Sequence, residues 1–253
     1  MRKNKTSRIF VIVFCALLTT AFFTESGFAQ NKEETTTPYS FSYMQVRPGM
    51  DVEFEDFVKS KIPFLKKLGV TDLTVFKTSN FGTSGKYLFV SPLGAPEKAD
   101  AELASDRSMM PVELVSVFSA LNRMVVSSHD FMLIPQDDMN VPPPEGYVFK
   151  VVACITMGTV PGSSEEFKKE YKKMINVMAK GNTKGILVGK VGFGGDLDEY
   201  ITFGLFDSFK EIASHSAKVQ KEMESINTKH LMKLLRYRKG ETFVRIPELC
   251  IVP

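Results

Sequence analysis

The sequence PGMDVEF at residues 48–54 returns in altered form as PGSSEEF at residues 161–167, 113 positions later. In both copies Pro-Gly precedes a stretch with helical spacing of apolar residues, and a Phe ends the motif. Two further pairs keep the same spacing: Lys77 with Lys190, and Tyr87 with Tyr200. A fixed period of this length indicates two copies of one small domain.

The N-terminus has the pattern of a secretory signal peptide at residues 1–29. A basic start is followed by an apolar run at residues 9–23, and Gly27 and Ala29 are small residues suited to a cleavage site. The run is shorter than the roughly 20 residues of a membrane span. We therefore predict export to the periplasm or the medium, with no stable membrane span after cleavage. The alternative is an uncleaved N-terminal anchor.

The charge of the chain belongs largely to that N-terminal segment. The whole chain has 32 Lys plus Arg against 29 Asp plus Glu, and residues 1–29 hold four of the basic residues and one acid. The remainder is therefore balanced, with 28 of each sign. Because nucleic-acid binding requires clustered positive charge, nothing in this composition predicts a nucleic-acid partner.

The rest of the chain divides by composition and by the repeat. The predicted parts are a flexible lead-in at 30–38, repeat 1 at 39–135, a Pro-rich linker at 136–146, repeat 2 at 147–248 and a C-terminal tail at 249–253.

Each repeat is predicted to run strand, helix, strand, strand, helix, strand. In repeat 1 the strands are expected at 39–46, 73–79, 86–91 and 128–135, with helices at 54–68 and 111–124. In repeat 2 the strands are expected at 147–157, 185–193, 199–206 and 241–247, with helices at 163–180 and from 207 to about 237, broken near Asn227. This order is the ferredoxin-like split unit, whose antiparallel sheet has helices on one face only. The predicted class is α+β, and two tandem repeats can cover their bare sheet faces by forming one intramolecular α+β barrel.

In its duplicated β-α-β-β-α-β order, the chain resembles the dimeric α+β-barrel (ferredoxin-like) superfamily in its fused two-repeat form. That superfamily includes small monooxygenases, isomerases and haem-dependent chlorite dismutase-like enzymes. The resemblance rests on element order and not on a specific motif. It implies a ligand site inside the barrel, but not the chemistry of that site.

Alternation along the strands predicts which side chains line the barrel. We expect the apolar pairs Leu88 and Val90, and Ile201 and Phe203, to face the helices. The opposite face is then aromatic with a few polar groups. The predicted ligand-binding residues are Tyr43, Tyr87, His129, Tyr200, Glu241 and Arg245. Each has a simpler alternative: the tyrosines fill the barrel centre, and the charged residues meet water at its rim.

Motifs for specific chemistry are missing: the chain has no HExxH, CxxC, GxSxG or P-loop, and no metal site is predicted. The primary hypothesis is a protein that binds a small apolar or aromatic molecule in a tyrosine-lined cavity between the sheets, or a cofactor-independent enzyme acting there. The alternatives are a haem protein using His215 or His230 as axial ligand, and an assembly module with a filled barrel. The cofactor is left open, and homo-oligomerisation is a further candidate.

Overall fold

The computed structural model describes residues 37–67, 69–79, 85–93, 112–223 and 228–252. The predicted signal peptide at 1–29 lies outside these residues. By contacts the chain forms two compact units. Unit 1 comprises residues up to 77, 81–132 and 246–253, and unit 2 comprises 78–80 and 133–245.

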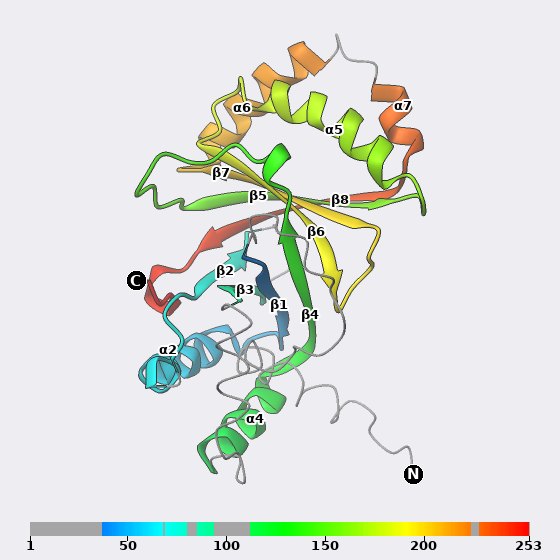
Figure 1. Cartoon of the computed structure of the whole chain (residues 1–253). Coiled ribbons are helices and arrows are strands. Elements are labelled where there is room, and N and C mark those ends of the chain that lie inside the picture. The colour runs from blue at the N-terminus through cyan, green and yellow to red at the C-terminus, as the bar shows by residue number, and fades with distance from the viewer. Residues whose placement is uncertain (1–36, 68, 80–84, 94–111, 224–227, 253) are drawn as a thin grey trace. The chain divides into compact units, whose positions relative to one another are not determined.

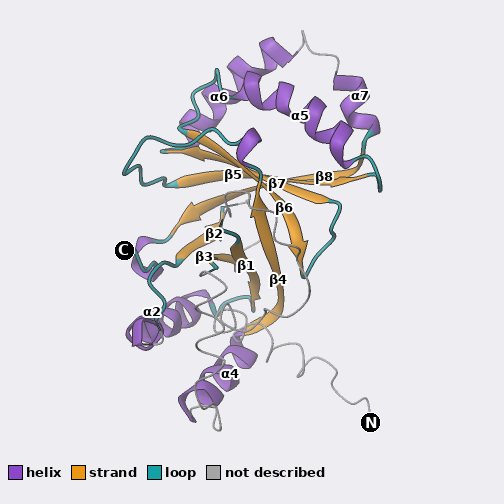
Figure 2. Cartoon of the chain, in the orientation of Figure 1, coloured by secondary structure: helices purple, strands orange, loops and turns teal. Residues whose placement is uncertain are grey.

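Eight strands form one closed barrel, hydrogen-bonded in the order β1-β3-β2-β8-β5-β7-β6-β4. Their bounds are β1 Tyr39–Val46, β2 Thr74–Thr78, β3 Lys86–Pro92, β4 Val125–Pro135, β5 Val151–Thr159, β6 Gly185–Phe193, β7 Glu199–Phe206 and β8 Leu235–Arg245. The described α-helices are α2 Asp51–Lys67, α4 Val112–Met124, α5 Ser164–Met178, α6 Phe209–Met223 and α7 Thr228–Lys233. The predicted α+β class, the duplicated order and the single barrel are thus confirmed (Figure 2).

In unit 1, α2 and α4 pack on one face of the sheet (Figure 1). The turn into α2 has Gly49 at φ 84°, and the turn into α5 has Gly162 at φ 82°. This left-handed conformation is strained for any residue with a Cβ. The repeated Pro-Gly is therefore the chain reversal that starts each first helix, and α2 continues through Pro63 without ending there.

In unit 2, α5, α6 and α7 lie on one side of the sheet (Figure 1). The core beneath them includes Phe167 and Tyr171 of α5 and Leu231 of α7, packed on Ile186 and Val188 of β6. Each sheet therefore has a helix-covered face and an opposite face, which we call the helix-free face.

Each unit is completed by the segment that follows the last strand of the other repeat. Leu249 and Ile251, beyond β8, belong to the core of unit 1, and Ile251 bridges Leu73. Met139, within the predicted linker, is buried in the core of unit 2, and Val141 bridges Ile186. The start of the linker is therefore packed structure, and only its proline-rich end resembles a spacer.

Several element boundaries differ from prediction in repeat 2: its first strand begins at Val151 and not at residue 147, and the largest difference is at the last helix and strand. The last helical stretch was expected to reach about residue 237, but α7 ends at Lys233 and β8 begins at Leu235. Pairing explains the difference, because Leu235 and Tyr237 join the β5 ladder at Thr159 and Gly158, where the register shifts. No described helix has the length and apolar character needed to cross a membrane.

Candidate functional site

An aromatic cluster occupies the helix-free face of unit 1. The ring of Phe131 stacks on Phe41 at 5.4 Å and on Tyr43 at 5.8 Å between centroids, and the His129 ring lies 5.7 Å from Phe131. The Lys86 ammonium stands over the Tyr43 ring at 4.4 Å. Phe41 and Phe131 are buried, whereas His129 is exposed. On this face, apolar rings are therefore packed beside groups that can donate or accept hydrogen bonds.

Alternation places these residues on the face away from the helices. Met44 and Val46, which alternate with Phe41 and Tyr43 along β1, belong to the core under α2 and α4. Successive strand side chains point to opposite faces. Two predicted site residues, Tyr43 and His129, are thus brought together around Phe131.

Two more predicted residues lie on the helix-free face of unit 2. Glu241 is paired with Cys154 across β5 and β8, whereas the neighbouring Ile155 packs against the helix-side core. The Glu241 carboxylate lies 3.3 Å from Lys239 Nζ. Arg245, four residues along β8, falls on the same face by alternation.

The prediction that Tyr87 and Tyr200 line the barrel is wrong. Tyr87 is fully buried in the core under α2 and α4, and Tyr200 is fully buried in the core under α5. The cause is the register of the ladder: Tyr43 is paired with Leu88, so Leu88 and not Tyr87 shares the face of Tyr43. Leu88, Val90, Ile201 and Phe203 accordingly lie on the opposite face from the one expected.

Tyr87 belongs instead to a charged cluster at the start of α2. Its hydroxyl donates to Glu55 Oε1 at 2.6 Å and lies 3.1 Å from Asp51 Oδ1. Lys77 Nζ lies 2.9 Å from each of these two oxygens. Burial and the two carboxylates raise the pKa of Tyr87 far above its usual value, so this hydroxyl is a donor and not a base.

Sequence reasoning missed Asp51 and Glu55 as partners of this tyrosine. They are four residues apart at the start of a helix and so share one helix face. That spacing, together with the recurrence of Lys77 and Tyr87 as Lys190 and Tyr200 in the second repeat, was the sequence pattern that could have indicated this cluster.

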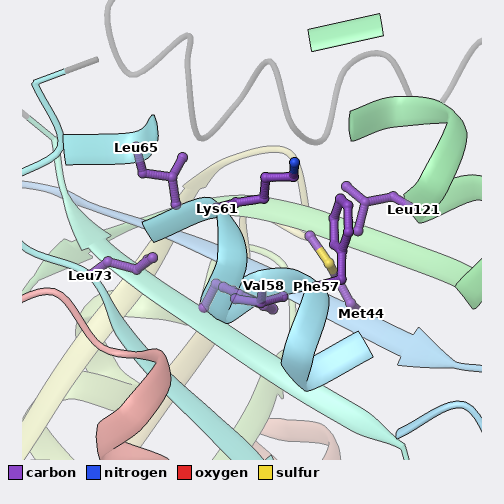
Figure 3. Close-up of a pocket in the computed structure, with 8 residues that line it drawn as sticks. Met44, Phe57, Val58, Lys61, Leu65, Leu73 and Leu121 are labelled. Carbon is purple, nitrogen blue, oxygen red and sulfur yellow. The ribbon is translucent and has the colours of Figure 1, made fainter. Parts of the chain in front are cut away.

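An apolar pocket lies on the helix side of unit 1, between α2, α4 and the strands (Figure 3). It is lined by Met44, Phe57, Val58, Lys61, Leu65, Leu73, Phe89 and Leu121. Its volume is about 20 Å³, which is the space of about one water-sized probe. This pocket is therefore too small to hold an organic ligand in the present conformation.

The two histidines of repeat 2, His215 and His230, make their contacts on the helix side of unit 2. His215 is buried in unit 2, where Nδ1 accepts a hydrogen bond from the Asn182 amide at 3.1 Å and the ring lies 5.2 Å from Phe206. Burial lowers the pKa of His215. His230 Nε2 lies 2.8 Å from Glu166 at the surface.

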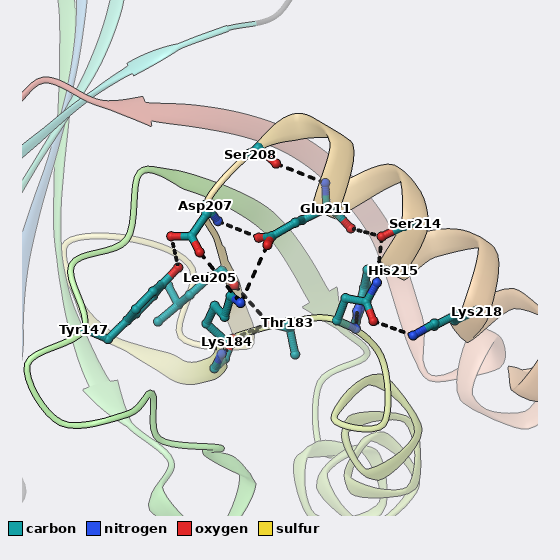
Figure 4. A network of polar contacts seen from close by, with 12 residues as sticks. Tyr147, Thr183, Lys184, Leu205, Asp207, Ser208, Glu211, Ser214, His215 and Lys218 are labelled. Atoms are coloured by element: carbon teal, nitrogen blue, oxygen red, sulfur yellow. Dashed lines mark hydrogen bonds and ion pairs between the residues drawn. The ribbon is translucent and has the colours of Figure 1, made fainter.

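Figure 4 shows His215 next to a polar network at the start of α6. Ser208 Oγ accepts from the Glu211 amide at 3.3 Å, and the Glu211 carboxylate accepts from the Asp207 amide at 2.8 Å. This arrangement resembles a capping box, and it stabilises the helix start. Because neither His215 nor His230 lies on the helix-free face of unit 2, these residues do not fit a haem held by a histidine of repeat 2 inside the barrel.

Asp130 is half-buried on the other side of β4 from His129 and Phe131, and its carboxyl oxygen Oδ1 is buried. Among the described residues its Oδ1 has no hydrogen-bond partner, and neither does Ser128 Oγ. Burial raises the pKa of Asp130, and the neighbouring Ser42 hydroxyl and His129 offset this only in part. Ionised Asp130 therefore destabilises the folded state.

We expect Asp130→Asn to unfold at a higher denaturant concentration than the parent protein at pH 7.5. The gain should be on the order of 1 kcal/mol, because the amide carries no charge at a site where burial disfavours the charged carboxylate. Because the folded-state pKa is raised, the parent protein loses stability as the pH rises through that pKa, and the gain should disappear near pH 4. Urea unfolding at both pH values measures this, and equal gains at both would contradict it.

Comparisons with solved structures agree with this architecture. A candidate monooxygenase from Lactobacillus acidophilus NCFM superposes with a TM-score of 0.55 at 12% identity, covering 85% of this chain and 96% of that one. An anthrone oxidase-like protein superposes with a TM-score of 0.61 at 10% identity, covering 84% of this chain and 92% of that one. A chlorite dismutase variant from Candidatus Nitrospira defluvii superposes with a TM-score of 0.55 at 10% identity, covering 85% of this chain and 93% of that one.

No protein-family model matches the chain, and no curated protein matches it in sequence. At these identities the structural likeness shows the fold alone. The chain has the dimeric α+β-barrel fold, with both repeats in one polypeptide.

Proposed function

We propose that this is an exported protein that binds a small aromatic or apolar molecule inside its barrel, against the helix-free face of unit 1. The observation that carries the proposal is the cluster of Phe41, Tyr43, His129 and Phe131. Stacked rings next to a few polar groups are typical of small-molecule sites. An aromatic ligand adds to such a stack with about 0.5–1.5 kcal/mol per ring pair beyond area burial.

The polar groups of the cluster define what such a ligand would meet. His129 is exposed and lies beside the Phe131 ring, and the ammonium of Lys86 stands over the ring of Tyr43, whose hydroxyl is the third polar group. These groups favour a ligand with an aromatic body and a hydrogen-bonding substituent. If the protein is an enzyme, His129 and Tyr43 are the groups suited to proton transfer.

The structural neighbours support this reading only by analogy. One of them is an anthrone oxidase-like protein, and an anthrone is an aromatic ketone. The same fold also occurs in a chlorite dismutase, so the fold does not choose between substrates. Export rests on the sequence of residues 1–29.

The proposal is tested by titrating 2-naphthol into the mature protein and following aromatic side-chain resonances by NMR. Resonances of Tyr43, His129 and Phe131 should shift together and saturate. Phe131→Leu should weaken binding about tenfold, because one stacking partner of about 1 kcal/mol and part of the buried area are lost.

The control is the same substitution on the helix side, Phe89→Leu. Phe89 is buried against Phe54, at 6.2 Å between centroids, and should not alter the affinity. Saturation at Tyr87 and Phe89 without shifts at Tyr43 would place the ligand on the wrong face. A lack of any saturable shift would count against an aromatic ligand. Native mass spectrometry of protein from its own host would then identify the molecule that is carried.

A further inference from the structure

Two matched positions of the repeats hold different side chains beside a lysine–tyrosine pair that both repeats keep. The spacing of 113 residues relates Asp51 to Ser164, Glu55 to Lys168, Lys77 to Lys190 and Tyr87 to Tyr200. The lysine and the tyrosine are kept in both repeats, whereas both carboxylates of repeat 1 are replaced in repeat 2. The two sites are otherwise alike, since Phe54 packs on Tyr87 at 4.7 Å and Phe167 packs on Tyr200 at 4.8 Å.

In unit 1 the lysine–tyrosine pair binds carboxylate oxygens of its own chain. Lys77 Nζ lies 2.9 Å from Glu55 Oε1 and 2.9 Å from Asp51 Oδ1, and the Tyr87 hydroxyl donates to Glu55. Burial opposes the charge on Lys77, but the two carboxylates outweigh it and raise the pKa of the ammonium group. The geometry is that of a cation and a hydroxyl that share an anionic partner.

In unit 2 the same pair has hydroxyl oxygen where unit 1 has carboxylate oxygen. Ser164 Oγ lies 2.5 Å from the Tyr200 hydroxyl and 3.4 Å from Lys190 Nζ. Lys190 stands over the Tyr200 ring at 5.7 Å. In the parts of the chain that the structure describes, no carboxylate forms an ion pair with Lys190.

The charge of the two sites is therefore opposite. Asp51, Glu55 and Lys77 sum to one negative charge, whereas Lys190, Lys168 and its partner Glu165 sum to one positive charge. Lys168 is paired with Glu165 at 3.0 Å, and this contact raises the pKa of its ammonium group, so Lys190 is the cation of the site that has no ion pair among the described residues. An ammonium group without an ion pair, next to the hydroxyl groups of Ser164 and Tyr200, is a favourable place for an anion.

One hydroxyl group of the Ser164–Tyr200 pair can donate a hydrogen bond to such an anion. Ser164 and Tyr200 share one hydrogen bond between them, so one of their two hydroxyl protons remains available whichever group donates. Burial raises the pKa of Tyr200, which keeps the phenol protonated at neutral pH. Lys190 retains further N–H groups beside its contact with Ser164.

We propose that Lys190, Ser164 and Tyr200 form a binding site for the carboxylate group of a small molecule, with Lys168 at its edge. The site lies on the helix side of unit 2 and is separate from the aromatic face of unit 1. The class of ligand follows from unit 1, where the matched lysine and tyrosine hold carboxylates. This proposal does not depend on the aromatic ligand.

The test is an NMR titration with sodium acetate, in which sodium chloride keeps the ionic strength constant. Acetate should shift the resonances of Ser164, Lys190 and Tyr200 and saturate. Ser164→Asp places a carboxylate where Asp51 stands in unit 1, and should weaken acetate binding at least tenfold. Lys190→Gln should do the same, and it serves if the first variant does not fold.

Lys172→Gln is the matched control, because Lys172 is an exposed lysine of the same helix, 3.4 Å from Asp138. It should bind acetate like the parent protein. Ser164→Asp should also raise Tm without acetate, since it supplies Lys190 with an internal partner. An unchanged Kd in Ser164→Asp and Lys190→Gln, or no saturation in the parent protein, overturns the site. Inorganic phosphate that shifts these resonances where acetate does not would overturn the assignment to carboxylates.

Discussion

Lys77→Met is expected to destabilise the protein by about 2–3 kcal/mol, the cost of removing one partner from a mostly buried ion pair. The ammonium group of Lys77 holds the carboxylates of Asp51 and Glu55 beside a fully buried tyrosine. Without it, two negative charges remain close together, with side chains only 20% and 32% exposed. Guanidinium unfolding at pH 7.5 measures the loss.

The repeat provides the control for this substitution. Lys190→Met removes the matched lysine of unit 2, where no described carboxylate is paired with it, so the loss should stay within about 0.5 kcal/mol. Tyr87→Phe should cost about 1 kcal/mol, the value of one hydrogen bond. Equal losses for Lys77→Met and Lys190→Met would show that the ion pairs of unit 1 contribute nothing specific.

Gly189→Ala is expected to cost about 2 kcal/mol by forcing an extra methyl group into a filled space. A Cβ at Gly189 would stand 2.3 Å from Leu133 Cγ, closer than any real carbon contact. Leu133 is only 4% exposed, so it has little room to move. Denaturant unfolding of this variant gives the cost directly.

The steric cause is separated from other effects by a double-mutant cycle. Leu133→Ala alone destabilises the protein by leaving a cavity. In that background Gly189→Ala should change the free energy of unfolding very little, so the two losses should differ from additivity by more than about 1 kcal/mol. Gly240→Ala is the control, because a Cβ there meets nothing within 4 Å. Additive losses in the cycle would show that Leu133 is not the obstacle.

The architecture was largely predictable from local patterns. The repeated Pro-Gly, the apolar spacing that follows it and the alternation in the strands together predict the order of elements, and the barrel confirms it. The end of the last helix was mispredicted, because Leu235 to Tyr237 have ambiguous local preferences and a ladder partner at Gly158 and Thr159 decides their state.

The candidate site was predictable in part. Tyr43, His129, Glu241 and Arg245 lie on the helix-free faces, as alternation on β1, β4 and β8 predicted. Tyr87 and Tyr200 do not, because β3 and β7 are apolar on both faces and alternation there gives no contrast.

The amino-acid sequence by itself determined that the chain contains one domain twice, since periodicity is a property of neighbouring residues. Only the tertiary structure decided which way β3 and β7 face. That choice depends on how each strand is paired with one far away in the chain, and a shift of one residue turns every side chain to the other face. The pairing of Tyr43 with Leu88 made this choice, and it moved Tyr87 from the barrel interior to the carboxylates of α2.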